Sequence, residues 1–394
     1  MRIAIDAGVI GTGRGGDETY MRNLLAGLAM ASGDAHEFLV YLRPTAVAPA
    51  EIRNDRRFTV RRLAVLPSPL RYGLGLPLAL MRERPSADLV LTTNHAPIVS
   101  PVPRVLLVHD LSFRHHPEHY TATTRRRLNW LVPIHARQAR LVVTVSEFSR
   151  EDIVRELGVP ADRVAVVPNS VREIVRTPRG PVSGLRARGI GDRFFLYVGN
   201  LQPRKNLARL IGAFARARTR SSAVAGHQLV IAGAPAWRAD DVMQAAAALP
   251  GLVILLGRID DAERDELLDR ATALAYVSLF EGFGLPPLEA MARGTPVLAS
   301  ATTAIPEVVG DAALLVDPTD VDAIAGGLAR LAEDPLLRER LRERGRARAS
   351  AYSVRRMGEA ALAAFATARA AGDRRSMTTA YALDVAMKDE GEVG

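Results

Sequence analysis

The feature that most limits how this chain can fold is an alternation of short apolar runs with helix-like segments, which stops once and then starts again. The apolar runs of the first half are RIAID, EFLVYL, FTVRRL, DLVLTT, RVLLVHD, LVVTVS and VAVVPN. The second half repeats the pattern with FFLYVGN, HQLVIAGA, LVILLGR, ALAYVSL, PVLAS and ALLVDP. Val/Ile/Leu-rich runs between amphipathic helices indicate a parallel sheet covered on both faces. We therefore expect an α/β fold with two doubly wound domains.

The break between the two halves predicts the domain boundary. Residues 171–193 are rich in Pro, Gly and Arg and interrupt the rhythm, which is typical of a linker. We place a first domain at 1–172 and a second at 173–352, facing each other across a cleft. Ligands are expected at the carboxyl ends of the strands. Residues 373–394 are polar and unpatterned, so we expect a mobile tail there.

Composition excludes several classes of protein. The chain has no cysteine, so disulfides, thiolate nucleophiles and cysteine metal sites are absent. No stretch approaches the roughly 18 consecutive apolar residues of a membrane span. The opening MRIAIDAG is a strand pattern and lacks the longer apolar region of a secretory signal. We therefore expect a cytoplasmic location, at the inner face of the membrane if the chain contacts lipid.

The net charge of +9 allows more than one interpretation. The basic clusters form either a solvated face or a face that contacts anionic lipid or an acceptor. Aromatic residues do not interleave with them, so we expect no nucleic-acid partner. The clusters lie in RNDRRFTVRR and TRRRLNW and consist of Arg53, Arg56, Arg57, Arg61, Arg62, Arg125, Arg126 and Arg127.

The segment GNLQPRKN stands between a strand-like run and a helix-like run. Its Lys205 is one of only two lysines in a chain with 52 Lys plus Arg. Gly199 permits close backbone approach, Arg204 offers a planar fork, and Lys205 offers a compact charge. This set suits a diphosphate at a strand end. The alternative is a solvated pair at a helix start, where positive charge opposes the helix dipole.

The segment EGFGLPPLEA predicts a second part of the same site. Glu281 follows the apolar run ALAYVSLF, at the strand edge where ligands bind. Pro287 can begin a helix that carries Glu289 in its first turn. Glu289 is therefore either a ligand-binding group or a glutamate that stabilises the helix dipole.

A histidine ends a strand of the first half. His109 closes RVLLVHD, where it can donate a hydrogen bond or handle a proton across the cleft, although a local turn with Asp110 as a cap is the alternative. The nearby His115, His116 and His119 have no spacing that suggests a tetrahedral set, so we expect no metal site.

Two further patterns favour structural interpretations. GTGRGG at 11–16 matches a dinucleotide-binding loop, but the second strand ends in Leu42 and Arg43, where such a site needs an acid. Asp320 and Asp322 precede a long helix and are expected to cap it instead of holding a metal.

Several segments occur together in a recognisable order. They are GRGGDETYMRNLL, HDLSFRHHPEHY, VSEFSREDI, VPNSV, YVGNLQPRKNL, LVIAG, EGFGLPPLEAMARGTPVLAS and the segment from Pro306 to Asp311. Together they resemble the retaining family 4 glycosyltransferases, whose GT-B fold has two Rossmann-like domains. The similarity runs from residue 1 to about 370. It implies that a helix at about 353–370 packs back on the first domain.

The resemblance implies roles for the residues on the second domain. Arg204 and Lys205 would bind the donor diphosphate, and Glu289 would hold the ribose hydroxyls. Glu281 would hold the donor sugar and the phosphate region. The backbone at Phe283, Gly284 and Leu285 would assist it, and Gly233 and Arg258 would border the nucleoside.

Across the cleft, the resemblance implies that His109 contacts the donor sugar. Gly15 and Gly16 would line the acceptor and phosphate side. The segment GGDETY departs from many relatives after the glycines, which leaves the acceptor open.

The implied reaction is transfer of a hexose from a nucleotide sugar to a hydroxyl acceptor with retention. HDLSFRHHPEHY resembles the mannosyltransferase-like branch and favours GDP-mannose over a UDP sugar. No metal or cofactor is expected, and the acceptor would be a glycan or a lipid-linked sugar in cell-surface polysaccharide, lipopolysaccharide or glycolipid synthesis. An NADP-dependent oxidoreductase and a non-catalytic nucleotide-sugar sensor remain as competing classes of protein.

Overall fold

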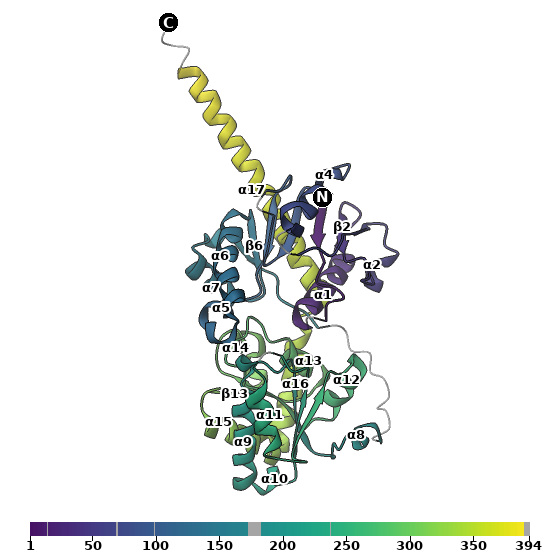
Figure 1. Ribbon diagram of the computed structural model, residues 1–394, viewed down its shortest axis with the longest axis vertical. Helices are drawn as coiled ribbons and strands as arrows, with labels where there is room; N and C mark the ends of the chain where they lie inside the picture. Colours follow the sequence, from purple (N-terminus) through teal and green to yellow (C-terminus); the bar gives the residue numbers. More distant parts are fainter. Residues whose placement is uncertain (14, 68–69, 98, 172–182, 237, 390–394) are drawn as a thin grey trace.

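The chain forms two α/β domains that lie one above the other (Figure 1). The computed structural model describes residues 1–13, 15–67, 70–97, 99–171, 183–236 and 238–389, and for 372–389 it describes the backbone alone. The boundary that we place at 172/173 lies outside the described residues and stays a prediction.

The first domain is built on a parallel sheet of seven strands, as the seven apolar runs predict. In order across the sheet the strands are β3 (Phe58–Arg62), β2 (Glu37–Leu42), β1 (Arg2–Asp6), β4 (Leu89–Thr93), β5 (Arg104–Leu107), β6 (Leu141–Thr144) and β7 (Val164–Val166). The helices are α1 (Gly15–Ala31), α2 (Ala50–Arg53), the π-helical turn η1 (Arg71–Gly75), α4 (Leu76–Arg82), α5 (Ser112–His115), η2 (Pro117–His119), α6 (Ala122–Gln138), α7 (Glu147–Leu157) and η3 (Ala161–Arg163).

The second domain repeats the plan with six parallel strands. Their order is β10 (Val253–Gly257), β9 (Gln228–Ala232), β8 (Phe194–Val198), β11 (Ala273–Tyr276), β12 (Val297–Ser300) and β13 (Leu314–Val316). The helices are α8 (Ser183–Ala187), η4 (Pro203–Lys205), α9 (Leu207–Arg220), α10 (Ser222–Ala225), α11 (Asp240–Ala247), α12 (Asp261–Arg270), α13 (Leu285–Arg293), α14 (Ile305–Val309), η5 (Gly310–Ala312), α15 (Val321–Glu333) and α16 (Pro335–Ser350). One more helix, α17 (Val354–Asp389), follows the second domain.

Both sheets have a switch point at which the strand order reverses. It lies between β1 and β4 in the first sheet and between β8 and β11 in the second. Ligands of doubly wound folds bind at the carboxyl ends of the strands that flank such a point. The segments that follow β8 and β11 are GNLQPRKN and the EGFG loop, so the fold brings the two motifs together.

The last helix returns to the first domain. α17 packs against α1, and the two helices cross so closely that a Cβ on Gly358 would lie 2.0 Å from the carbonyl oxygen of Gly27. Its backbone stays helical to Asp389, through most of the segment for which we expect a mobile tail, and these last turns extend away from both domains (Figure 1). Whether they are mobile stays a prediction.

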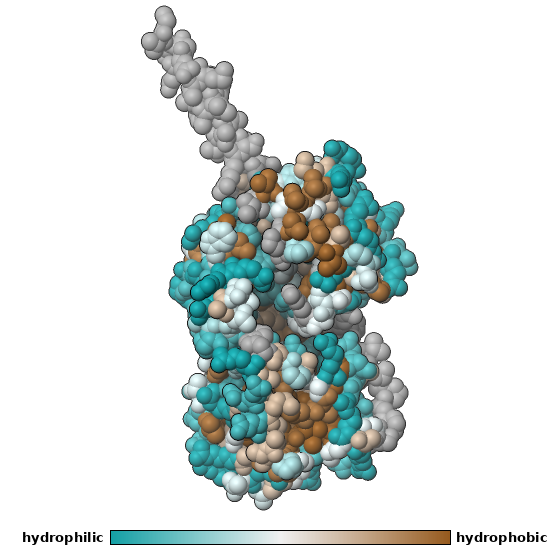
Figure 2. Space-filling view, viewed as in Figure 1, coloured by the Kyte–Doolittle hydropathy of each residue, from teal (hydrophilic) through white to brown (hydrophobic). Residues whose placement is uncertain are grey.

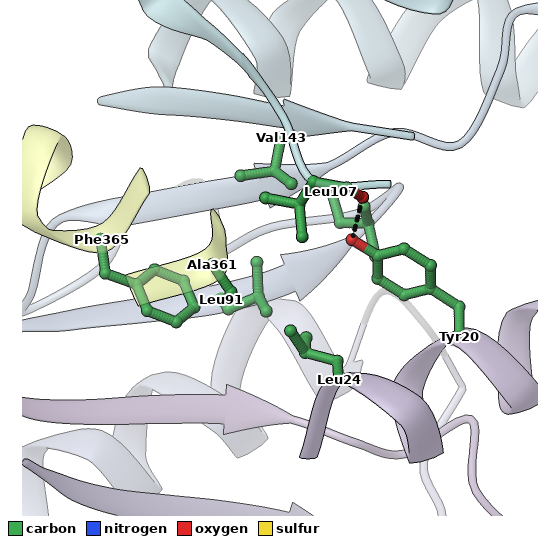
Figure 3. A pocket seen from close by; sticks show the side chains of 8 residues that line it. Tyr20, Leu24, Leu91, Leu107, Val143, Ala361 and Phe365 are labelled. Carbon is green, nitrogen blue, oxygen red and sulfur yellow. Dashed lines mark hydrogen bonds between the residues drawn. The ribbon is translucent and has the colours of Figure 1, made fainter. Parts of the chain in front are cut away.

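The contact between α17, α1 and the first sheet leaves a small apolar cavity of about 10 Å³ (Figure 3). Leu24, Ala361 and Phe365 line it, and the hydroxyl of Tyr20 donates to the carbonyl of Val167 at 3.1 Å. It holds at most about one water, so it is a packing gap in the core and no substrate site.

The helices bear on two further expectations. Asp320 caps α15, as predicted, because its carboxylate accepts from the backbone N–H groups of Asp322 and Ala323. Asp322 lies within the helix and pairs with Arg216 and Arg220 instead of capping it. Among the helices of the described residues, none is both long and apolar enough to cross a membrane.

Candidate functional site

Four side chains meet at the switch point of the second sheet. Nζ of Lys205 lies 2.5 Å from Oε1 of Glu281 and 2.9 Å from the hydroxyl of Tyr276. Nη1 of Arg204 donates to Oε2 of the same carboxylate at 3.0 Å. Lys205 and Glu281 are only 8% and 6% exposed. The structure thus joins residues 76 positions apart into one buried cluster.

Charge interactions decide the protonation states in this cluster. Burial alone would raise the pKa of Glu281, but Lys205 and Arg204 outweigh burial and hold it at about 2. Burial lowers the pKa of Lys205 to about 8, and the charge of Arg204 adds to that effect while Glu281 opposes it. The pKa of Arg204 is raised because Glu281 and Asp110 outweigh burial. At neutral pH the cluster therefore carries two cations and one anion, and its excess positive charge suits an anionic ligand.

The local chain conformation aims both cations at this point. Arg204 and Lys205 lie in the 3₁₀ turn η4, before α9 begins, and not at the start of the α-helix itself. Asn206 follows in a left-handed conformation with φ of 62°, and its Nδ2 donates to the carbonyls of Val277 and Pro318. This amide ties the turn to the segment after β11.

Glycines allow the loops after β8 and β9 to meet. A Cβ on Gly233 would lie 1.9 Å from the carbonyl oxygen of Gly199, so any side chain there would collide with the backbone. Gly199 itself adopts a φ of 145°, and a Cβ on it would lie 2.8 Å from the hydroxyl of Tyr197. The two loops are therefore held close together at the carboxyl edge of the sheet.

Glu289 occupies a different part of the same edge. Its side chain is 20% exposed and lies 4.0 Å from Nη1 of Arg264. Burial raises its pKa, which Arg264 opposes. The prediction that Glu289 lies in the first turn of its helix is wrong, because α13 begins at Leu285, two residues before Pro287. Gly284 makes this earlier start possible, since it adopts a left-handed φ of 114°.

His109 approaches from the first domain. Its Nε2 is buried, has no hydrogen-bond partner among the described residues, and lies 3.6 Å from a carboxylate oxygen of Asp17. The ring of Tyr20 packs edge-on against the imidazole at 5.0 Å. A Cβ on Gly282 would lie 2.5 Å from the carbonyl oxygen of His109, so the EGFG loop lies directly against this segment.

The glycine-rich loop at 11–16 also faces the second domain. A Cβ on Gly13 would lie 3.0 Å from Nη1 of Arg258, and one on Gly15 would lie 3.9 Å from Nδ2 of Asn200. Nothing lies within 4 Å of the corresponding position on Gly16, which leaves open space there. Figure 2 shows a recess between the two domains.

The remaining predicted residues lie around this centre. Phe283 is 7% exposed and its ring packs edge-on against Tyr352, at 5.6 Å. A Cβ on Gly284 would lie 2.6 Å from Cδ1 of Ile305, and the φ of 114° disfavours any residue with a side chain. Leu285 is the first residue of α13.

The histidines after β5 form a separate group. Ligand atoms of His116, Glu118 and His119 lie within 4.8 Å of one another, which the sequence spacing did not indicate. The imidazole rings stack at 5.1 Å with an angle of 8° between them. Burial lowers the pKa of His119, and the nearby charges of Arg204 and Arg238 add to this effect. Positive charge so close disfavours a cation, and the expectation of no metal site here stays a prediction.

Sequence reasoning missed several contributors. Tyr276 bonds both Lys205 and Glu281, and its one signal was a polar tip inside the apolar run ALAYVSL. Glu307 lies within the segment from Pro306 to Asp311 but had no predicted role. Its carboxylate contacts the backbone of Glu147 and Phe148 in the other domain.

Two family profiles match most of this chain. Residues 14–173 match the family profile described as Glycosyltransferase Family 4, and residues 187–348 match Glycosyl transferases group 1. The O-antigen chain mannosyltransferase B of Escherichia coli is 34% identical over 256 residues, which are 63% of this chain and 66% of that protein. The MMP alpha-(1->4)-mannosyltransferase of Mycolicibacterium hassiacum is 34% identical over 54% of this chain and 50% of its own length.

Solved structures show the same fold at lower identity. Anabaena HepE in complex with UDP and glucose superposes with a TM-score of 0.71 at 20% identity, over 93% of this chain and 100% of that one. Sucrose-phosphate synthase of Thermosynechococcus elongatus gives a TM-score of 0.69 at 20% identity, over 97% and 100%. The two facing domains therefore have the GT-B arrangement. With both domains matched by family profiles, the chain belongs to the family 4 glycosyltransferases.

Proposed function

We propose that this protein transfers a hexose from a nucleotide sugar to a hydroxyl acceptor with retention of anomeric configuration. The observation that carries the proposal is the buried cluster of Arg204, Lys205 and Glu281 at the switch point, with His109 opposite it. In this role the two cations bind the donor diphosphate and stabilise the charge that it gains on departure. Glu289 holds the ribose, and His109 contacts the sugar.

GDP-mannose is the donor that we propose first. The support comes from relatives described as mannosyltransferases, two of which are 34% identical to this chain over the matched region. A UDP sugar is the second candidate, because HepE of the same fold was solved with UDP-glucose. Membership of a glycosyltransferase family speaks against the nicotinamide alternative.

A thermal-shift screen with GDP, UDP, ADP and their sugars tests the donor. A ligand at 100 times its dissociation constant adds about 2.7 kcal/mol to the free energy of unfolding, so the correct nucleotide should raise the melting temperature clearly. Transfer from the best donor to a hydroxyl acceptor, followed by analysis of the anomeric product, tests the reaction. A chain that responds to no nucleotide would contradict the proposal. Binding without transfer to any acceptor would favour a sensor.

We propose that departure and attack occur on the same face of the sugar. A covalent route needs a free carboxylate beneath the anomeric carbon. Glu281 is poorly suited to that task, because Lys205, Tyr276 and Arg204 engage both of its oxygens and its pKa lies near 2. The departing phosphate itself can then accept the proton of the incoming hydroxyl.

Activity is expected to survive excess EDTA. In the proposed site Arg204 and Lys205 supply the positive charge that magnesium or manganese provides in other transferases. The measurement is the initial rate of transfer before and after chelation. A loss of turnover that manganese restores would contradict this expectation.

The acceptor that we propose is a glycan or lipid-linked sugar used in cell-surface polysaccharide, lipopolysaccharide or glycolipid synthesis, at the inner face of the membrane. Of the two basic clusters, we propose the one on α6 as the surface that contacts lipid. Arg56, Arg57 and Arg61 form ion pairs with Asp34, Asp55 and Glu83. Arg125, Arg126 and Arg127 of α6 form no ion pair with any residue that the structure describes. Trp130 follows them and is 68% exposed.

Binding to anionic vesicles should therefore depend on α6. We expect binding to weaken steeply with salt. The double substitution of Arg126→Gln and Arg127→Gln should reduce it about thirty-fold, since each basic residue near an anionic surface contributes about 1 kcal/mol. Arg56→Gln is the matched control, because that guanidinium is already paired. Cosedimentation with anionic and neutral vesicles measures the effect. Equal binding to both kinds of vesicle, or none at low salt, would leave the solvated-face interpretation.

A further inference from the structure

Helix α7 of the first domain directs its N-terminus at the second domain. The backbone N–H groups of Glu147 and Phe148 donate to Oε1 and Oε2 of Glu307, at 2.8 and 3.0 Å. The first N–H groups of a helix have no partner within the helix and form the positive end of its dipole. A carboxylate from one domain therefore caps a helix of the other.

The same helix end holds the loop that carries Glu281. The hydroxyl of Ser146 donates to the carbonyl of Gly282 at 2.7 Å. The hydroxyl of Ser149 lies 3.2 Å from that carbonyl and 3.2 Å from the carbonyl of His109. A side chain on Gly282 would collide with His109, as its Cβ would lie 2.5 Å from that carbonyl oxygen. The residue after Glu281 is thus packed against the backbone of His109.

Two hydrogen bonds connect the loop at Glu281 with the residues just before α14, the helix that carries Glu307. The backbone N–H of Glu281 donates to Oγ1 of Thr303 at 3.2 Å, and the N–H of Ala304 donates to the carbonyl of Glu281 at 3.4 Å. Thr303 adopts a φ of 57°, which is unusual for a β-branched residue and persists only where surrounding contacts enforce it. Since α14 begins at Ile305, displacement of Glu307 would move the loop.

An aromatic contact closes the same boundary. Phe280 is 4% exposed and its ring lies 5.2 Å from that of His115, 5.7 Å from that of His116 and 5.8 Å from that of Phe148. These partners all belong to the first domain. The two residues on either side of Glu281 are therefore both held by the opposite domain.

We propose that Glu307 is a positioning residue for the reaction. By capping α7 it sets the distance between the two domains, and through Thr303 and Ala304 it holds Glu281 in register with His109. The effect on turnover rests on the proposed function, in which Glu281 and His109 act on one sugar. The effect of Glu307 on the contact between the domains does not depend on the proposed function.

The first test separates turnover from binding. In Glu307→Gln an NH₂ group replaces one carboxylate oxygen and cannot accept a bond from the N–H that it faces. We expect kcat to fall about ten- to hundred-fold, as for a small misplacement of reacting groups, while the Kd of free GDP, measured by calorimetry, stays within about twofold. Ser149→Ala should change kcat in the same direction. It removes the hydroxyl and leaves a good helix former in α7.

The second test measures the domains directly and needs no substrate. The chain has no cysteine, so Asp162→Cys and Ala247→Cys in the exposed surfaces of the two domains accept a unique pair of fluorophores. Energy transfer between them should fall when Glu307→Gln is added. Glu339→Gln is the matched control, because its side chain is 57% exposed and pairs with Arg342 within α16. It should change neither energy transfer nor kcat.

Three results would overturn the proposal. They are an unchanged kcat in Glu307→Gln, a lower melting temperature as the sole effect, and a reduced kcat with unchanged energy transfer. A parent chain that transfers no sugar, yet shows the expected change in energy transfer, would contradict the proposed function and still support the domain contact.

Discussion

Glu281→Gln is expected to lower kcat by about 10² to 10³ while free GDP binds nearly as well as to the parent protein. The carboxylate of Glu281 is the shared acceptor for Lys205, Arg204 and Tyr276. The amide of glutamine carries no charge, and its NH₂ group cannot accept a hydrogen bond from the group that it faces. Lys205 and Arg204 therefore lose the carboxylate that orients them. Their alignment matters most when the departing diphosphate gains charge. Steady-state kinetics with the preferred donor, beside calorimetry with GDP, measures the two effects.

Glu289→Ala provides the contrast. In the proposed role Glu289 holds the ribose, which does not change during the reaction, so its loss should raise the donor KM and leave kcat nearly intact.

Removing one partner of a buried ion pair can cost about 3 to 5 kcal/mol of stability, so a melting curve must accompany the kinetics of Glu281→Gln. If Glu281→Gln kept the parent kcat and Glu289→Ala abolished it, the proposed roles would be wrong. If neither variant mattered, the catalytic site would lie elsewhere.

The strands were predictable because burial on both faces of a parallel sheet demands continuous apolar runs. Each run named in the sequence analysis contains a strand, from RIAID at β1 to ALLVDP at β13. The start of α7 at Glu147 also has a local cause, since Ser146 is a favourable N-cap and its side chain accepts from the backbone N–H of Ser149. The turn η4 was not, because its conformation depends on the bonds of Asn206 to Val277 and Pro318, which lie 71 and 112 positions away.

Arg204, Lys205 and Glu281 were predictable as neighbours, but Tyr276 and the contacts among the four side chains were not. The segments that carry Lys205 and Glu281 follow β8 and β11, which are neighbours at the switch point. Both residues were therefore expected at the same edge of the sheet. Nothing in the sequence shows that the carboxylate bonds the ammonium directly, which makes it a counter-ion as well as a candidate sugar ligand. The pairing of Arg56, Arg57 and Arg61 was equally hidden, because their acidic partners follow from tertiary packing.

Affinity for the free nucleoside diphosphate is expected to weaken as the pH rises above about 8. Burial and Arg204 lower the pKa of Lys205 to about 8 in the free protein, so the ammonium is largely neutralised by pH 9. A bound diphosphate favours the charged form and raises this pKa. Binding therefore takes up a proton above pH 8, and the Kd should rise up to about tenfold per pH unit until the pKa of the complex is reached.

Calorimetry with GDP at intervals between pH 7 and 9.5 measures this slope, and variants of Lys205 assign it. Lys205→Met should bind GDP weakly, with little of the slope, because no group at this position titrates. Lys205→Arg keeps a charge that does not titrate in this range, so its profile should also be flat. Its affinity at pH 7 should nevertheless fall, because the ammonium occupies a buried position between Tyr276 and Glu281 that the larger guanidinium cannot fill unchanged.

The base of GDP also loses a proton near the upper end of this pH range. This loss affects the parent and the variants equally, so the difference between their slopes belongs to the side chain at position 205. A slope that persists in Lys205→Met would assign the titration to another group, and a parent profile that is flat to pH 9.5 would show that Lys205 does not lose its proton there.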